Sequence, residues 1–470
     1  MRIPMRLQLV LLALLLASAA HAALPVPVAA ALKRAGIAPA AVGLQVIDVA
    51  SGKSVLALNP ELALNPASTM KLLTTDAALE LLGPTYTFAT RAYTRGTRRG
   101  DQLLGDLILR GGGDPKLVVE NFWLFLRKIR AQGVRVIRGN LVLDRGAFDA
   151  TVVDPALFDG DPLKAYNVAP DALLLNFHAL AVRFTPDAAQ GQVQVTFDPG
   201  LGAYTARPPQ LTTGDCIGDW RQAMRAQLGA ERASFDGSFA SGCGEKTWQL
   251  HPYDMPRNRY FELVFRQLWS ELGGTLEGSV VDGTLTPEAL LLTQWDSPAI
   301  PELIRDVNKF SNNVMARQLF LTLGTTGSLQ PASVDAGRSA VLRWLAAKNI
   351  DATGLVLENG AGLSRIERIS AGTMGTVLVA AFRSPTMPEF IASLPLVGYD
   401  GTMKQRLRSD GVAGHAHIKS GSLQDVRSIA GYVFAASGRQ YAVAFLINHA
   451  DAARGAEAQD ALLQWVYENK

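Results

Sequence analysis

The sequence predicts a multidomain fold: an α/β domain, with an antiparallel sheet flanked by helices, that is split by a strand-rich insertion. Helical spacing and strand-like alternation occur near both ends of the chain, whereas the middle has short strands separated by Gly, Pro and Asp. A chain of 470 residues also exceeds one ordinary core. We expect the α/β domain over 23–85 and 286–470, with 86–285 as one inserted domain or a nested pair.

The N-terminus has the features of a secretory signal peptide. Arg2 and Arg6 precede the apolar run "LQLVLLALLLA", and "AHA" at positions 20–22 offers small residues for cleavage after Ala22. We therefore expect a signal peptide over 1–22 and a mature protein outside the cytoplasm; retention as an uncleaved anchor is the alternative. Cleavage lowers the formal charge from +3 to +1, so the composition gives no reason to expect a nucleic-acid partner.

The first mature elements are a hairpin and a helix. The segment "GLQVIDVASGKSVLAL", residues 43–58, alternates apolar and polar residues around a turn, which predicts a β-hairpin. Asn65 suits a helix N-cap, Pro66 suits the first turn, and the leucines that follow recur at a spacing near 3.6. We expect a helix from about Pro66 to Leu82, where Gly83 and Pro84 end the pattern.

The remaining pattern alternates between the two kinds of element. In the insertion, "DLILRGGGDPKL" reads as a strand that ends in a glycine-rich turn. Further helices are expected near 120–132, 300–308, 313–323 and 335–348 and over "GAEAQDALLQWVYENK", and strands near 139–143, 181–184 and 193–197 and over "AHIKSGSL", "RSIAGYVFAA" and "YAVAFLIN".

Two cysteines, Cys216 and Cys243, lie in a loop-rich stretch of the insertion. In an oxidising compartment such a pair most simply forms one disulfide. A bridge that closes a loop of this length contributes about 3 kcal/mol. Two cysteines with no histidine nearby do not indicate a metal site, and we expect neither a metal nor a cofactor.

The segment "NPASTMKLLTT" places Ser68 and Lys71 three residues apart on the predicted helix. Residues at this spacing are neighbours on one face, so the amine can reach the hydroxyl. A serine needs an adjacent base to act as a nucleophile, and a lysine supplies it when desolvation or a second cation keeps the amine neutral. In the alternative, Ser68 is solvated and Lys71 extends along the helix surface.

A second polar cluster occurs in "KFSNNVMARQL", at the start of another predicted helix. Ser311 could relay a proton, and Asn313 could hydrogen-bond a substrate amide. The alternative for Ser311 or Asn312 is a simple helix N-cap.

A third cluster, in "HIKSGSL", lies on a predicted strand near the C-terminus. Lys419 supplies a positive charge, Ser420 a hydroxyl, and Gly421 room for a substrate backbone. At a sheet edge, this strand could pair with an extended peptide and hold its terminal carboxylate. A surface lysine that protects an edge strand is the alternative.

Together the three clusters follow the order S-x-x-K, S-x-N and K-(T/S)-G on the expected elements, and the chain therefore resembles the serine penicillin-binding proteins and related β-lactamases. The sequence around the three motifs is similar to that of low-molecular-mass class C penicillin-binding proteins, the D-alanyl-D-alanine carboxypeptidase/endopeptidase family. The resemblance covers nearly the whole mature chain and includes "LRGGGDPKL", "YNVAPDALLLNFHA", "LENGAGLSRIERIS" and "SLPLVGYDGTMKQRL".

The resemblance implies a role for each motif residue. Ser68 would be the acylated nucleophile, Lys71 its base and Ser311 the proton relay. Asn313 would bind substrate, and Lys419 and Ser420 would bind the terminal carboxylate. The backbone N–H groups of Ser68 and Ser422 would form the oxyanion hole. Ser420 stands where the family most often has Thr, so the hydroxyl is kept and a methyl is lost.

The resemblance also implies a substrate and a periplasmic location. The substrate would be peptidoglycan stem peptides that end in D-Ala-D-Ala, or cross-links between D-Ala and a diamino acid, and β-lactam antibiotics would be inhibitors. A zwitterionic diamino acid side chain would need a cation and an anion, for which Arg365 and Asp161 are the candidates. Peripheral membrane association through an amphipathic surface, and a homodimer, stay open.

Other functions remain as alternatives. A β-lactamase uses much of the same chemistry but rarely needs so long an insertion. A cell-wall scaffold with a degenerate site is disfavoured because all three motifs keep their essential groups. A Ser-His-Asp esterase would need a G-x-S-x-G motif, and a zinc peptidase would need His/Asp clusters; we find neither in the sequence.

Overall fold

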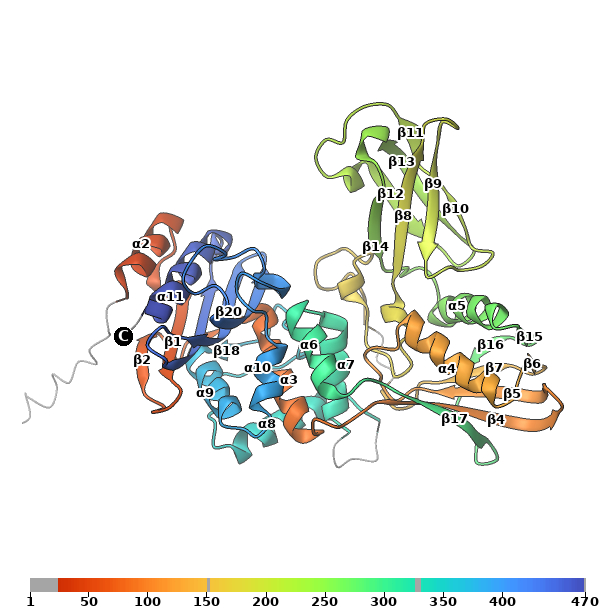
Figure 1. The fold of residues 1–470 in the computed structure, drawn as a ribbon, viewed down its shortest axis with the longest axis horizontal. Helices are drawn as coiled ribbons and strands as arrows, with labels where there is room; N and C mark the ends of the chain where they lie inside the picture. The colour runs from red at the N-terminus through yellow and green to blue at the C-terminus, as the bar shows by residue number, and fades with distance from the viewer. Residues whose placement is uncertain (1–23, 150–152, 326–330, 469–470) are drawn as a thin grey trace, which may run out of the picture.

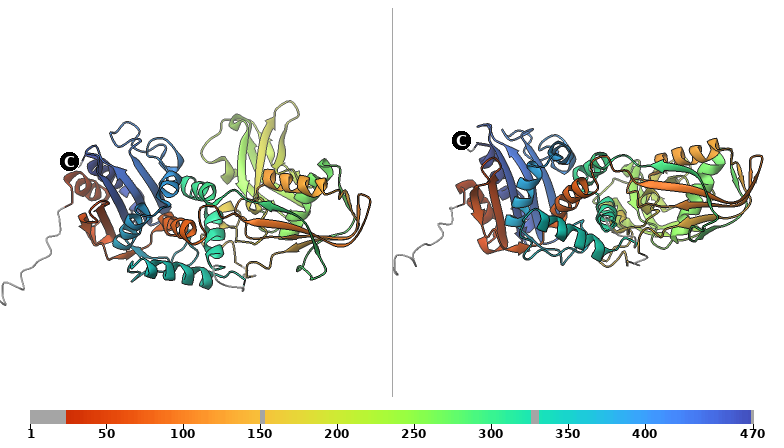
Figure 2. Two further views of the ribbon diagram at one scale, coloured as in Figure 1. Left: turned by 60° about the horizontal axis from the view of Figure 1, so that its bottom comes forward. Right: turned by 90° about the horizontal axis from the view of Figure 1, so that it is seen from below.

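The computed structural model describes residues 24–149, 153–325 and 331–468. The expected signal peptide, 1–22, lies outside this part of the chain. Figure 1 shows the two chain ends together in one domain at the left of the view, and the insertion at the right. The views in Figure 2 keep the same division. The chain therefore leaves this domain after its first segments and returns to it near its C-terminal end.

A five-stranded antiparallel sheet unites the two ends of the chain. Its order is β19-β20-β21-β1-β2, and β1 pairs with β21 from Val42↔Ile447 to Asp48↔Tyr441. The predicted hairpin is confirmed, because β1 and β2 are antiparallel neighbours. The strands span Val42–Asp48 (β1), Ser54–Leu58 (β2), Ala416–Leu423 (β19), Val426–Phe434 (β20) and Gln440–Asn448 (β21).

Helices cover both faces of this sheet because its strands are apolar on both sides. In β20, Ile429 and Val433 face one core, whereas Ala430 and Tyr432 face the other. The first core contains α2 (Val26–Ala35) and α11 (Ala456–Glu468). The second contains α3 (Lys71–Leu81), α6 (Ile300–Lys309), α7 (Asn313–Leu323), α8 (Val334–Ala347), α9 (Ala371–Phe382) and α10 (Met387–Ser393). The predicted α/β fold class is confirmed.

A seven-stranded sheet forms the base of the insertion. Its main path is β15-β6-β5-β4-β17, with β7 beside β5 and β16 beside β7. Helices α4 (Val119–Ala131) and α5 (Arg257–Glu271) share its core. Because β17 pairs with β4, this sheet continues past residue 285. The strands are Ala89–Arg99 (β4), Gln102–Arg110 (β5), Val136–Ile137 (β6), Leu141–Asp144 (β7), Thr275–Leu276 (β15), Val280–Asp282 (β16) and Leu290–Asp296 (β17).

Two smaller sheets extend from this base (Figure 1). One has the order β14-β8-β9, and in the other β10, β11 and β12 each pair with β13. The predicted disulfide Cys216–Cys243 is present beside them. The strands are Leu180–Asp187 (β8), Gln192–Asp198 (β9), Thr205–Arg207 (β10), Gln210–Thr212 (β11), Met224–Leu228 (β12), Arg232–Ala240 (β13) and Lys246–Leu250 (β14).

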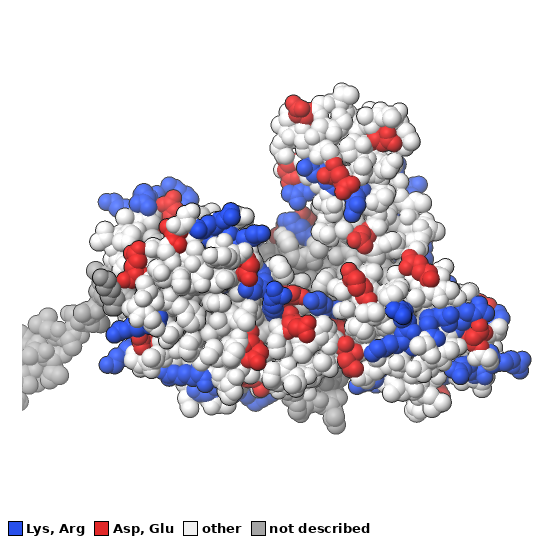
Figure 3. Space-filling model, in the orientation of Figure 1, with Lys and Arg blue, Asp and Glu red and all other residues white. Residues whose placement is uncertain are grey.

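Charge is divided unevenly within the insertion. Residues 86–140 hold eleven Lys and Arg against four Asp and Glu, whereas 141–285 hold eleven against eighteen. Figure 3 shows the basic side chains gathered over α4 and the outer end of the β4–β5 hairpin. The two local excesses cancel, so residues 86–285 have a formal net charge of zero.

Candidate active site

The chain reaches Ser68 through a tight turn. The side-chain oxygen of Asn65 accepts a hydrogen bond from the N–H of Ala67 (2.9 Å), and Ala67 adopts a left-handed φ of 46°. A 3₁₀ turn, Ala67–Met70, follows, and α3 begins only at Lys71. The prediction of a continuous helix from Pro66 is therefore wrong in its first turn. Because a 3₁₀ helix has three residues per turn, the side chains of Ser68 and Lys71 lie directly in line.

Lys71 is completely buried and contacts three oxygen atoms. Its Nζ lies 2.9 Å from Ser68 Oγ, 2.5 Å from Asn313 Oδ1 and 2.5 Å from the carbonyl oxygen of Ala361. Burial holds the pKa of Lys71 well below its ordinary value, and the nearby cation Lys419 lowers the pKa further. The structure therefore favours the neutral amine.

A neutral amine in this position is suited to act as a base. It has two N–H donors and one lone pair. The side-chain oxygen of Asn313 and the carbonyl oxygen of Ala361 can only accept, so they can take both donors. The lone pair is then left for the hydroxyl hydrogen of Ser68. An arrangement of this kind can activate a serine hydroxyl without a histidine or an acidic side chain.

Ser311 lies directly before α7 in a left-handed conformation, with φ of 58°. The helix itself is capped by Asn312, whose side chain accepts a hydrogen bond from the N–H of Met315 (3.0 Å). Ser311 is thus not the cap, and its hydroxyl accepts a hydrogen bond from Lys419 Nζ (3.0 Å). Asn313, the first residue of α7, points to Lys71 from the same turn.

Lys419 enters the site from β19 and is also completely buried. Burial lowers the pKa of Lys419 to about 7. Its Nζ donates to Ser311 Oγ and to the carbonyl oxygen of Ser420 (2.6 Å). The hydroxyl of Ser420 donates to that of Thr402 (2.8 Å) at the exposed end of the site. The Lys419 amine therefore contacts Ser311, while the Ser420 and Thr402 hydroxyl groups form a pair at the exposed end of the site. A cation with hydroxyl donors is suited to bind an anion.

Gly421 allows β19 to lie against the turn that carries Ser68. A Cβ atom at Gly421 would come within 2.8 Å of the backbone N of Ser68 and 2.2 Å of Ser428 Oγ. Any larger residue would push the strand away. The strand therefore lies against the amide of Ser68 at Gly421, and Ser422 is the next residue along it.

Arg365 and Asp161, the two candidates for a specificity pocket, have different positions. Arg365 lines a pocket of about 440 Å³, and its guanidinium lies 4.7 Å from the ring centre of Phe158. Asp161 is not among the described residues that line this pocket; its carboxylate lies 3.6 Å from Lys164. Asp154 and Glu358 do line the pocket. They are the acidic groups that share it with Arg365.

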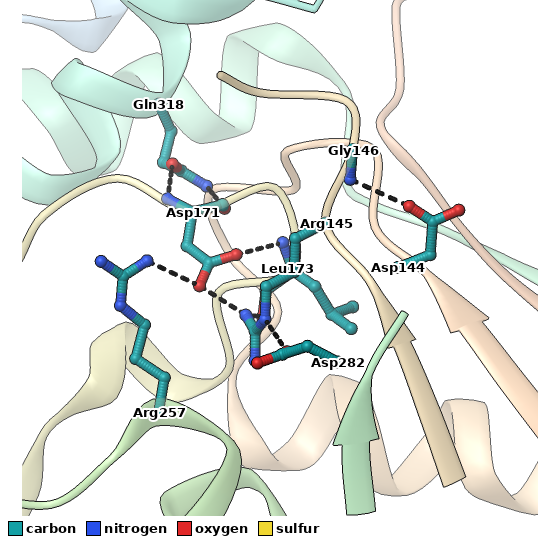
Figure 4. Close-up of polar contacts among 8 residues, drawn as sticks. All are labelled: Asp144, Arg145, Gly146, Asp171, Leu173, Arg257, Asp282 and Gln318. Carbon is teal, nitrogen blue, oxygen red and sulfur yellow. Dashed lines mark hydrogen bonds and ion pairs between the residues drawn. The ribbon is translucent and has the colours of Figure 1, made fainter. Parts of the chain in front are cut away.

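The helix that carries Asn313 is tied to the insertion at Gln318. The Gln318 side chain accepts a hydrogen bond from the N–H of Asp171 (2.9 Å) and donates to its carbonyl oxygen (2.8 Å). Figure 4 shows that the Asp171 carboxylate faces Arg145 and Arg257, and Arg145 also contacts Asp282. This cluster joins α7, α5 and the ends of β7 and β16, so it fixes the insertion against the site.

Sequence reasoning missed three participants. The carbonyl group of Ala361 contacts Lys71, but a backbone group leaves no signal in a sequence. Arg317 and Glu367 are buried charged residues whose charges act on Lys71. Arg317 follows Asn313 by one helical turn, so the sequence spacing alone could have placed Arg317 near the site.

No group of His, Cys, Asp and Glu in the described residues could hold a metal ion. Within the same residues, no helix is long and apolar enough to cross a membrane.

Known proteins share this fold and these segments. A family model for the D-Ala-D-Ala carboxypeptidase 3 (S13) family matches residues 26–469. The chain belongs to this family. The D-alanyl-D-alanine carboxypeptidase of Actinomadura sp. strain R39 is 30% identical over 412 residues, which are 83% of this chain and 74% of that protein. Membership of the S13 family confirms the predicted class of enzyme, a serine-type D-Ala-D-Ala carboxypeptidase.

Solved structures agree with the S13 assignment at the level of the fold. The crystal structure of penicillin binding protein 4 (dacB) from Haemophilus influenzae has a TM-score of 0.78 at 21% identity and covers 94% of this chain and 100% of that chain. The complex of that protein with a novel β-lactam has a TM-score of 0.74 at 22% identity, with the same coverage of both chains. The predicted penicillin-binding fold is thereby confirmed.

Proposed function

We propose that Ser68 is the nucleophile with which this S13 enzyme cleaves peptidoglycan stem peptides, through an acyl-enzyme, and that β-lactams acylate the same atom. One observation carries the proposal. The Lys71 amine lies 2.9 Å from Ser68 Oγ, while its other two contacts are acceptors that can take its hydrogens. Only a lone pair is then left to face the serine.

Acylation follows from this geometry. Ser68 Oγ attacks the carbonyl carbon of the penultimate D-Ala, and the hydroxyl proton passes to the Lys71 amine. The N–H groups of Ser68 and Ser422 stabilise the oxyanion. The C–N bond then breaks, and the proton reaches the departing amine through Ser311. Water hydrolyses the ester, which frees Ser68 and releases the shortened peptide.

Lys419, Ser420 and Thr402 would orient the substrate. A terminal D-Ala carboxylate fits beside the Lys419 amine, because the cation has no carboxylate among its contacts in the described residues. The two hydroxyl groups can donate to the same carboxylate. Asn313 would bind the amide on the acyl side of the scissile bond.

The pocket beside Arg365 would take a diamino acid side chain. Arg365 supplies the cation for its carboxylate, and Asp161 is the anion suggested by the sequence. Asp154 and Glu358 share the pocket with Arg365 and are the better-placed anions for its amine. We expect Asp154→Asn to reduce turnover of diaminopimelate peptides more than lysine peptides, and Asp161→Asn to have a smaller effect. Equal losses on both substrates for every variant would contradict this pocket.

We further propose that the enzyme acts in the periplasm, where its substrate lies. The signal-peptide pattern of residues 1–22 supports this location, and the expected cleavage after Ala22 can be checked by N-terminal sequencing of the protein from a periplasmic extract. Dimerisation and membrane association do not form part of the proposal, because no contact within the described residues supports either.

The decisive test is mass spectrometry of the intact mature protein after exposure to benzylpenicillin. We expect a mass increase of one opened drug molecule that is absent from Ser68→Ala. Labelling of Ser68→Ala would contradict the assignment. An unlabelled parent protein would instead support a scaffold if the drug stays intact, and a β-lactamase if the drug is hydrolysed.

A further inference from the structure

A closed loop, residues 356–368, packs against the turn that carries Ser68. Its ends are joined by an antiparallel bridge, in which Val356 and Arg368 exchange backbone hydrogen bonds of 2.9 and 3.1 Å. We call this segment the brace loop. It contains Arg365 of the specificity pocket and Ala361 of the Lys71 site, so it contacts both halves of the proposed active site.

The brace loop touches the catalytic turn at several points. The Ala361 carbonyl accepts from Lys71, and the Gly360 carbonyl accepts from the Thr74 hydroxyl (2.7 Å). A Cβ atom at Gly362 would come within 1.8 Å of the carbonyl oxygen of Ala67. The fit leaves no room for adjustment, and a small shift of the loop would move the Ala361 carbonyl away from the amine.

Glu367 holds the brace loop from inside. It is completely buried, and its Oε1 accepts hydrogen bonds from three successive backbone N–H groups, those of Glu358 (3.0 Å), Asn359 (2.8 Å) and Gly360 (2.9 Å). Its own N–H donates to Ser364 Oγ (3.0 Å). These bonds end at the residue directly before Ala361, and so they fix the direction of the next carbonyl group.

We propose that Glu367 is a positioning residue for acylation: by fixing the brace loop it holds the Ala361 carbonyl against Lys71 and keeps the lone pair of the amine directed at Ser68. This inference rests on the proposed function of Ser68 and Lys71. Glu367 touches neither of them; it acts through Ala361.

The charge of Glu367 gives this role a measurable signature. The charged groups that act on Lys71 are Lys419 from β19 and Arg317 from α7, which lower its pKa, and Glu367, which raises it. Burial raises the pKa of Glu367, the three backbone N–H groups that it accepts from oppose this shift, and the charge of Glu358 adds to it. Replacing Glu367 by Gln keeps an acceptor for the three N–H groups and removes the negative charge. The pKa of Lys71 should then fall further, so the amine stays neutral to lower pH.

The experiment measures acylation by benzylpenicillin between pH 5 and 10, with the rate constant of the covalent step separated from the dissociation constant of the initial complex. For Glu367→Gln we expect a rate constant within about threefold of the parent, with the acid limb of its pH profile moved to lower pH. For Glu367→Ala we expect a loss on the order of 100-fold in the rate constant at every pH, with the dissociation constant nearly unchanged. Glu389→Gln is a matched control. Like Glu367, Glu389 has a buried Oε2 with no hydrogen-bond partner among the described residues, but it lies on α10, outside the brace loop.

A folded Glu367→Ala variant that acylates at the parent rate would overturn the inference. So would a Glu367→Gln variant that acylates as slowly as Glu367→Ala and whose pH profile has the same acid limb as the parent. If Glu367→Ala fails to fold, the acid limb of Glu367→Gln decides alone. The two proposals fail in different ways. If benzylpenicillin labels Ser68→Ala, Ser68 is not the nucleophile and the proposed function fails. If Ser68→Ala stays unlabelled but the Glu367 variants behave as the parent, only the role of Glu367 fails.

Discussion

Two buried ionisable residues that both contact α7, Lys71 and Asp171, show how a fold separates a reactive group from a structural one. Both are at least 95% buried. Asp171 contacts two guanidinium groups, those of Arg145 and Arg257. Lys71 contacts a hydroxyl, an amide oxygen and a carbonyl oxygen, none of which carries a charge. Burial with an opposite charge fixes Asp171 as an ion, whereas burial among neutral acceptors favours a neutral Lys71.

The pKa of each group is lowered, with opposite consequences. Burial by itself would raise the pKa of Asp171, but the two arginines and the N–H of Leu173 outweigh it, so the charged form is favoured. Burial lowers the pKa of Lys71, so the uncharged form is favoured. The contrast predicts that mutations at Lys71 affect catalysis, and mutations at Asp171 affect folding.

The largest expected effect is on acylation. Lys71→Met should slow acylation by benzylpenicillin at least about 10³-fold, because the general base is lost. Asp171→Asn, among its folded molecules, should acylate within about threefold of the parent, since Asp171 touches no reacting atom. Stopped-flow measurement of drug binding checks both variants. Comparable losses for the two variants would remove the distinction between the two centres.

The next largest effect is on the free energy of unfolding, which Asp171→Asn and Lys71→Met should change in opposite directions. Asp171→Asn takes from Arg257 its carboxylate partner and leaves Arg145 with Asp282 alone, so it should lower the free energy of unfolding by about 3–5 kcal/mol. Lys71→Met removes a buried amine and should raise it. Urea unfolding followed by circular dichroism measures both changes at pH 7.

The pH dependence of these stability differences sharpens the contrast. Since the folded pKa of Asp171 lies below its unfolded value, its contribution is complete above about pH 4 and is lost as the pH falls through the folded pKa. The folded pKa of Lys71 is also below its unfolded value, so its unfavourable contribution is present at neutral pH and disappears as the pH rises towards about 10.4. The advantage of Lys71→Met should therefore shrink in alkali.

A smaller effect is expected at Lys419, a buried cation whose pKa falls to about 7. Below pH 7 it is charged and can bind a substrate carboxylate. Above pH 7 the KM for a peptide ending in D-Ala-D-Ala should rise up to about tenfold per pH unit. Lys419→Arg should flatten this rise, because arginine keeps its charge. A KM that does not change between pH 6 and 9 in the parent would contradict the carboxylate-binding role.

The smallest effect is expected at Ser420. Its hydroxyl bonds to Thr402 at the exposed end of the site, and threonine would keep this bond while adding a methyl group. Ser420→Thr should change the acylation rate and β-lactam affinity by less than about threefold. A loss of more than tenfold would show that the methyl group does not fit beside Thr402.

Local patterns predicted most of the helices and strands well. The helix over 313–323 matches α7 residue for residue, and the three C-terminal strands fall where their apolar runs predict. The helix at Ser68 is the instructive error. Its leucine spacing predicted α3, but the first turn is a 3₁₀ turn because Ala67 takes a left-handed conformation beneath Gly362, a residue almost 300 positions away. Short-range spacing contains no information about that contact.

Local patterns identified the chemical groups and their order along the chain: Ser68 with Lys71, Ser311 with Asn313, and Lys419 with Ser420. The protonation and alignment of these groups depend on how the chain folds. The pKa of an amine depends on burial and on charges from distant segments, and the direction of its lone pair depends on acceptors such as the Ala361 carbonyl. Those contributions come from Glu367, Arg317 and a backbone oxygen, which meet at Lys71 only when the chain has folded.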